Sequence, residues 1–138
     1  LGGGIGASEN YHGCSAIHSH MTNTRLTDVE IIERNYPVRI AQFGIRQGSG
    51  GQGAFAGGDG LYREYEFLEA VEISLITQRR QSRPFGLNGG GSGLCGENYF
   101  KAQGSEDWHK LDSLCSISAK AGDSLRILTP GGGGWGLK

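Results

Sequence analysis

The chain has 138 residues, and its 13 Lys and Arg residues nearly balance its 14 Asp and Glu residues, for a formal net charge of −1. This length suits one domain with a modest core, and the charge balance argues against a nucleic-acid or membrane-surface binder, because both need an excess of positive charge. No apolar run approaches the ~20 residues of a membrane span.

The first residues of the chain are rich in glycine. Leu1-Gly2-Gly3-Gly4 carries neither an initiator Met nor a signal region, which is typical of a cut through a larger chain. We interpret residues 1–13 as a glycine-rich loop. Residues 14–26 contain no Gly or Pro and show little helical periodicity, so an extended or irregular segment is expected there.

A short helix and a strand are predicted next. Residues 27–30 match the capping box, in which a hydroxyl and a carboxylate three residues later satisfy free backbone donors. Pro37 discourages helix just before it, so the helix is predicted over about 28–35. The strand is predicted over 38–47. Its two apolar pairs are out of phase, and a bulge near Ala41 would restore the alternation.

The later part of the chain alternates short strands with glycine. Apolar and polar residues alternate over 61–67 and over 71–77, and we expect this strand pair to carry the stability of the fold. Weaker strand candidates lie at 98–101, 115–119 and 124–129. Glycine-rich stretches lie at 48–60, 86–96 and 131–138. The pattern predicts a mainly-β domain, a glycine-rich β-sandwich or barrel-like domain with one short helix, as a fragment of a larger protein.

Glycine is the outlier of the composition, with 26 of 138 residues, more than twice the average of about 7%. The clusters lie between apolar segments and lack the triplet period of collagen. They are typical of tight turns, because glycine enters positive φ without a steric penalty. Positive φ or bulge geometry is therefore expected at most of Gly48, Gly51, Gly58 and Gly60.

The cysteines are Cys14, Cys95 and Cys115. An odd number at wide spacing is a poor disulfide framework, and no Cys-x-x-Cys pair indicates a zinc site. We therefore expect reduced thiols in a cytoplasmic protein.

Three stretches match the dinucleotide-binding pattern G-x-G-x-x-G: Gly48–Gly53, Gly91–Gly96 and Gly131–Gly136. That mechanism requires a helix after the glycines to hold the phosphate. The residues from Ala54 to Gly58 cannot form that helix, and no Walker-type pattern exists in the chain. We therefore predict no nucleotide site here.

His18-Ser19-His20 is the strongest chemical candidate, because residues two apart in an extended segment point to the same face. The imidazoles could reach one metal or one substrate, although two His side chains make only half a metal site. Asn23 offers an oriented amide, and Arg25 offers a planar fork for a carboxylate or phosphate. The alternative is that these side chains only hydrogen-bond the backbone of an irregular segment.

A cluster of arginines at 79, 80 and 83 could also bind an anion, although a solvated strand end is the more common explanation for such a cluster.

Several blocks occur in an order that is specific when they are taken together. They are His18–Asp28, Glu30–Glu33, Tyr36–Val38, Gly48–Gly53, Gly57–Gly60, Thr77–Arg80, Pro84–Gly86 and Thr129–Gly134. Jointly they resemble the hydantoinase B/5-oxoprolinase family over nearly the whole chain. Tyr11-His12-Gly13 resembles the eukaryotic-type 5-oxoprolinases, in which both halves of the enzyme lie on one chain.

The resemblance implies that residues 1–138 are a single C-terminal hydantoinase B-type domain, with residues 131–138 as a glycine-rich tail. The whole enzyme would be an ATP-dependent cyclic-amide hydrolase that opens 5-oxo-L-proline to L-glutamate. ATP and a divalent metal would bind outside this chain, and the isolated chain would be inactive. Its partners would be a hydantoinase A-type ATPase half and the rest of the B-type half, in a homo-oligomer without nucleic acid or membrane.

The resemblance also selects candidate site residues. We predict His20 and Arg25 as catalytic residues and His18, Asn23 and Thr24 as substrate-binding residues, and we assign no metal ligand. Two alternatives stay open. The chain could belong to a hydantoinase or a ketone carboxylase B-type subunit, or it could be a non-catalytic β scaffold that mediates subunit contacts.

Overall fold

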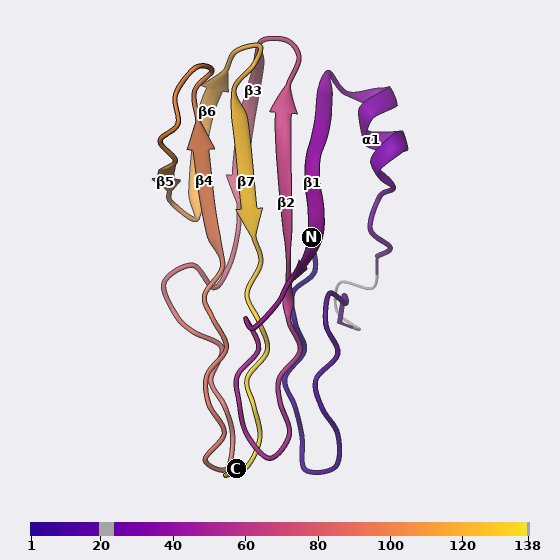
Figure 1. The fold of residues 1–138 in the computed structure, drawn as a ribbon, viewed down its shortest axis with the longest axis vertical. Helices are drawn as coiled ribbons and strands as arrows, with labels where there is room; N and C mark the ends of the chain where they lie inside the picture. Colours follow the sequence, from indigo (N-terminus) through magenta and orange to yellow (C-terminus); the bar gives the residue numbers. More distant parts are fainter. Residues whose placement is uncertain (20–23, 138) are drawn as a thin grey trace.

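The molecule is elongated, with β-strands in one half and extended glycine-rich segments in the other (Figure 1). The computed structural model describes residues 1–19 and 24–137. His20 and Asn23, both candidate site residues, therefore lie outside the described residues.

The described residues form one helix and seven strands: α1 (Val29–Asn35), β1 (Val38–Arg46), β2 (Gly60–Phe67), β3 (Val71–Ile76), β4 (Glu97–Lys101), β5 (His109–Leu111), β6 (Leu114–Ala119) and β7 (Ser124–Leu128). A five-stranded sheet has the order β1-β2-β7-β4-β5, and β3 pairs with β6 in a second sheet. All pairs are antiparallel. The mainly-β prediction is confirmed. Both sheets are open, so the described residues form no closed barrel.

The core lies between the two sheets. Cross-strand pairing places Ile40 opposite Tyr65 and Tyr65 opposite Leu125, so these residues share one face of the larger sheet. Leu75 of β3 and Ala119 of β6 belong to the same buried cluster. The smaller sheet therefore covers part of the larger one, as in a sandwich.

The bulge predicted in β1 is confirmed, because the register with β2 shifts between Ile40 and Gln42. The prediction of a capping box at residues 27–30 is wrong. The helix cap is Asp28, not Thr27, and its side chain forms no capping hydrogen bond. Ile32 packs against the core instead, so tertiary contact holds this short helix. No helix among the described residues is long and apolar enough to cross a membrane.

The predicted pairing of the strands over 61–67 and 71–77 is wrong. β2 pairs with β1 and β7, whereas β3 pairs with β6 in the other sheet. β2 and β3 each have one apolar face. Stacking the two sheets buries these faces against each other, whereas pairing β2 with β3 in one sheet would place both faces on the same side without a cover. The β3 register itself is as expected, since Val71, Ile73 and Leu75 face the core.

A pair of substitutions in β3 tests this register. Ile73 is half-buried against the core, so Ile73→Ala should lower the free energy of unfolding by about 1–2 kcal/mol. Ile76 is 83% exposed, and Ile76→Ala should change it by less than about 0.5 kcal/mol. Urea denaturation measures both values, and equal losses would show that β3 does not present one face to the core.

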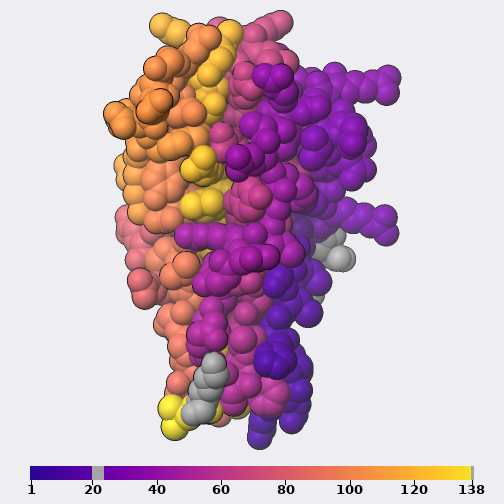
Figure 2. Space-filling view, viewed as in Figure 1, coloured from indigo at the N-terminus to yellow at the C-terminus, as the bar shows by residue number. Residues whose placement is uncertain are grey.

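The glycine-rich segments form a second packed unit, the glycine bundle, made of residues 1–17, 48–60, 84–96 and 129–137. Their backbones bond to one another. The Gly51 amide donates to the Gly132 carbonyl at 2.8 Å, the Gly58 amide to Ile5 at 2.9 Å, and the Gly134 amide to Gly91 at 2.9 Å. In Figure 2 these indigo, magenta, orange and yellow segments lie together in the narrower half.

Close approach, not turn geometry, explains most glycines of the bundle. Of the four positions expected to have positive φ, only Gly48 does. A Cβ on Gly51 would overlap the Gly91 carbonyl oxygen, and one on Gly58 would overlap that of Cys14. The prediction of positive φ is therefore wrong for Gly51, Gly58 and Gly60. Neighbouring backbones occupy the space that a side chain would need, as at the crowded axis of collagen.

Candidate functional site

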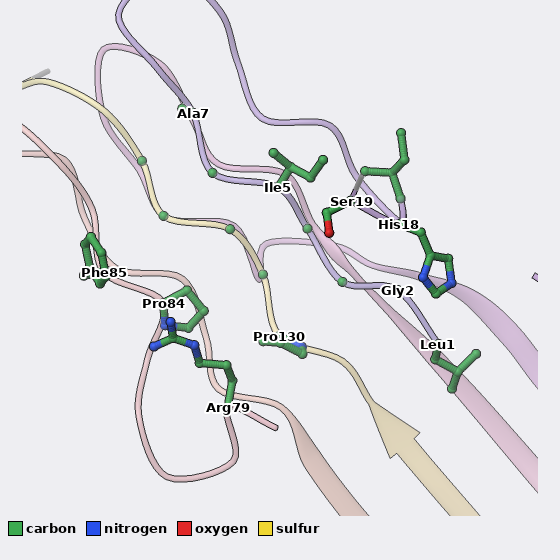
Figure 3. A pocket seen from close by; sticks show the side chains of 18 of the residues that line it. Leu1, Gly2, Ile5, Ala7, His18, Ser19, Arg79, Pro84, Phe85 and Pro130 are labelled. Atoms are coloured by element: carbon green, nitrogen blue, oxygen red, sulfur yellow. The ribbon is translucent and has the colours of Figure 1, made fainter. Parts of the chain in front are cut away.

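A cleft of about 790 Å³ lies beside the glycine bundle (Figure 3). It is lined by Leu1, Gly2, Gly3, Gly4, Ile5, Gly6, Ala7, Ile17, His18, Ser19, Thr24, Arg79, Pro84, Phe85, Leu87, Pro130, Gly131, Gly132, Gly133 and Gly134. In the view of Figure 3, His18 and Ser19 lie on one side of the segment that begins at Pro130, and Arg79 lies on the other. Glycine backbone and apolar residues form the remainder of the lining, so the side-chain chemistry of the cleft rests on its few polar residues.

A smaller pocket of about 280 Å³, here called the basic pocket, adjoins this cleft. Its lining is Leu1, His18, Thr24, Arg25, Leu26, Thr27, Ile32, Arg63 and Tyr65. Leu1, His18 and Thr24 line both spaces. The structure thus brings His18, Thr24 and Arg25 together around the basic pocket, and their roles stay predictions.

Arg25 is exposed. A purely structural Arg25 would pair with Asp28 or Glu30 and hold the start of the helix, and all three residues are described. The four ion pairs among the described residues join other side chains, and Arg25 pairs with neither Asp28 nor Glu30. Its guanidinium is therefore available to the pocket that it lines.

Arg63 is a site residue that sequence reasoning missed. It is only 2% exposed, and its Nε and Nη2 atoms are buried with no hydrogen-bond partner among the described residues. The guanidinium carbon lies 4.4 Å from the centre of the Phe43 ring, which attracts the charge but leaves these N–H donors unsatisfied. The signal in the sequence was its position, because Arg63 shares one face of β2 with the apolar residues Leu61, Tyr65 and Phe67.

Arg79 and Arg80, which follow β3, differ from each other in their contacts. Arg80 donates from Nε and Nη2 to the Asn98 side-chain oxygen at 3.2 and 3.0 Å and from Nη1 to the Gln78 carbonyl at 2.6 Å. Burial, and then repulsion by Arg46, lowers the pKa of Arg80 below its ordinary value, while Glu97 opposes the change. Arg80 is therefore structural. Arg79 lines the larger cleft.

The described residues do not fit an ATP or metal site. Within residues 1–19 and 24–137, no three His, Cys, Asp or Glu residues cluster to hold a metal ion. α1 is the sole helix of these residues and precedes all three G-x-G-x-x-G stretches, so none opens onto a helix N-terminus. Bundle amides such as those of Gly51 and Gly134 already donate to backbone carbonyls.

The chain is similar in sequence to a known protein family and to several of its members. The sequence profile of the family described as Hydantoinase B/oxoprolinase matches residues 1–138. The chain is 48% identical to 5-oxoprolinase 1 of Arabidopsis thaliana over 136 residues, 99% of this chain and 11% of that protein. It is 45% identical to 5-oxoprolinase of Dictyostelium discoideum over 138 residues, again 11% of that protein.

The fold is also present in a solved structure. The ATP-dependent caprolactamase from Pseudomonas jessenii superposes with a TM-score of 0.77 at 23% sequence identity, over 97% of this chain and 24% of that one. At this identity the likeness shows a shared fold. The match of the family profile and the identity to both 5-oxoprolinases extend over the whole length of this chain, which therefore belongs to the hydantoinase B/oxoprolinase family.

Proposed function

We propose that this chain is the C-terminal part of an ATP-dependent cyclic-amide hydrolase that opens 5-oxo-L-proline to L-glutamate. The observation that carries the proposal is the 48% identity to a protein named 5-oxoprolinase 1. Further support comes from the shared fold of a caprolactamase, whose name also records ATP dependence and a lactam.

The remainder of the proposed enzyme contains a hydantoinase A-type ATPase half and the rest of the B-type half. ATP and a divalent metal bind there, because the residues described here fit neither. The whole enzyme acts in the cytoplasm as a homo-oligomer. These statements are part of the proposal, since the chain spans 11% of each of the two 5-oxoprolinases compared above.

Within this chain, the segment from His18 to Arg25 does the chemistry. Ring opening adds water to the carbonyl carbon and breaks its bond to nitrogen, so the departing nitrogen must receive a proton. His20 supplies that proton, because a histidine pKa lies near working pH. Arg25 pairs with anionic oxygens of the substrate, and His18, Asn23 and Thr24 orient it or the attacking water.

A second candidate function is a non-catalytic scaffold. It is favoured by the glycine bundle, whose backbone hydrogen bonds hold it together without a ligand. The kinetic experiment below separates this scaffold from a catalytic segment.

Arg25→Lys should lower kcat/KM of the full-length enzyme for 5-oxoproline at least tenfold, about 1.4 kcal/mol, because lysine keeps the charge but loses the planar fork. His20→Ala should also lower it. Glutamate release coupled to ATP hydrolysis is the measurement. Arg34→Lys, in the exposed last turn of α1, is the matched control and should keep wild-type kinetics.

Other outcomes of this assay are equally informative. Wild-type kinetics in folded Arg25→Lys and His20→Ala proteins would support the scaffold. Turnover of a hydantoin but not of 5-oxoproline would support the hydantoinase alternative. Glutamate release by residues 1–138 alone would contradict the division of the site between this chain and the rest of the protein.

A further inference from the structure

The buried guanidinium of Arg63 has no anionic partner among the residues that the structure describes. The neighbouring carboxylates of β2, Glu64 and Glu66, alternate with Arg63 and lie on the opposite face of the sheet. Glu64 pairs with Arg126 at 2.9 Å and Glu66 with Arg39 at 2.6 Å. No Asp or Glu is among the described residues that line the basic pocket.

Such an arrangement is costly in the ligand-free protein. A buried charge without a hydrogen-bonded partner destabilises a fold, and proteins normally pair it. The Phe43 ring compensates part of this cost, but it cannot accept hydrogen bonds along the edge of the guanidinium. An anion that reached Arg63 would satisfy both donors at once.

The geometry of the free donors indicates which anion fits. Nε and Nη2 lie on one edge of the guanidinium plane, and their N–H bonds match two oxygens of one carboxylate or phosphate. Both atoms are covered in this structure. Arg63 lines the basic pocket, so binding of an anion there requires only a change of its side-chain rotamer.

We propose that the basic pocket binds a small carboxylate or phosphate anion, with Arg63 as its buried anchor and Arg25 and Thr24 at its exposed side. Two cations in the lining give the pocket the opposite sign to such a ligand. This identification of the ligand rests on the proposed function, in which the substrate is a lactam that bears a carboxylate.

Binding to the full-length protein without ATP tests the proposal by calorimetry. The probes are 5-oxoproline, 2-pyrrolidinone, which has the same ring without the carboxylate, and inorganic phosphate. Wild-type protein should bind 5-oxoproline at least tenfold more tightly than 2-pyrrolidinone. Arg63→Met should lose that preference and bind 5-oxoproline at least tenfold more weakly.

The phosphate arm distinguishes the source of the anion. If Arg63→Met weakens binding of inorganic phosphate and leaves the preference for 5-oxoproline intact, the pocket holds a phosphate. Arg126→Met is the matched control, since Arg126 also lies in the large sheet over an aromatic ring but already pairs with Glu64. It should lower the Tm and leave the binding of every probe unchanged.

The Tm of the ligand-free Arg63→Met protein completes the test. An unpaired Arg63 predicts an unchanged or higher Tm, because the variant removes an unsatisfied buried charge. A large fall would reveal a carboxylate partner elsewhere in the protein and would overturn the proposal. So would equal binding of all probes by wild type and Arg63→Met.

These binding results are independent of turnover. A protein that shows the Arg63 effect without hydrolysing 5-oxoproline retains the anion site and loses the proposed function. A protein that hydrolyses 5-oxoproline while its Arg63→Met variant binds every probe like wild type retains the proposed function and loses the anion site.

Discussion

Gly132→Ala should lower the free energy of unfolding by about 3–5 kcal/mol, at the upper end of what overpacking does. A Cβ on Gly132 would overlap the carbonyl oxygen of Ile5 and lie close to the Gly6 amide. Both neighbours are backbone, and no side-chain rotation can relieve the overlap. Urea denaturation of the variant, or its failure to accumulate as folded protein, measures the effect.

Gly6→Ala is the matched control in the same bundle. Its Cβ would meet nothing closer than the Gly133 carbonyl oxygen at 3.6 Å, an ordinary contact. It should therefore stay within about 1 kcal/mol of wild type. If Gly132→Ala were as mild as Gly6→Ala, the bundle would be loosely packed and its glycines would need another explanation.

Asn98→Ala should lower the free energy of unfolding by about 3–4 kcal/mol. Asn98 is 0% exposed, accepts two hydrogen bonds from Arg80 and donates one to the Thr77 hydroxyl at 2.9 Å. Alanine leaves the half-buried Arg80 charge without its acceptor, and hydrogen bonds to charged groups contribute about 1.5–3 kcal/mol. Thermal or urea unfolding measures the loss.

A double-mutant cycle with Arg80→Met identifies the origin of that loss. In the Arg80→Met background, Asn98→Ala should cost at least about 1 kcal/mol less, because no charge is left unpaired. Asn35→Ala, at the exposed end of α1, is the control and should change stability by less than about 0.5 kcal/mol. Additive effects of Asn98→Ala and Arg80→Met would contradict the coupling.

Local patterns in the sequence predicted the elements well. The bulge at Ala41 followed from two apolar pairs out of phase, and the inward face of β3 followed from strict alternation. Both are properties of neighbouring residues, because side chains in a strand alternate with a period of two. β5 (His109–Leu111) was missed, since three residues carry too little pattern to distinguish a strand from a loop.

The candidate site was predictable in part. The segment from His18 to Arg25 was identified by resemblance, and the structure places His18, Thr24 and Arg25 on the basic pocket. Arg63 was not identified, although it stood in phase with Leu61 and Tyr65. An arginine in an apolar phase is equally compatible with a snorkelling side chain, and only the packed sheets show that its donors are buried.

By itself, the sequence determined the family, the β class, the inward face of β3 and the position of the bulge, because motifs and period-two patterns are local. Only the tertiary structure decided which strands share a sheet, since β2 and β3 each offer the same apolar alternation to an edge or to a face. It also decided what the glycines do. A glycine that turns the chain and a glycine that admits a neighbouring backbone are the same residue, and the difference lies in segments far away in sequence.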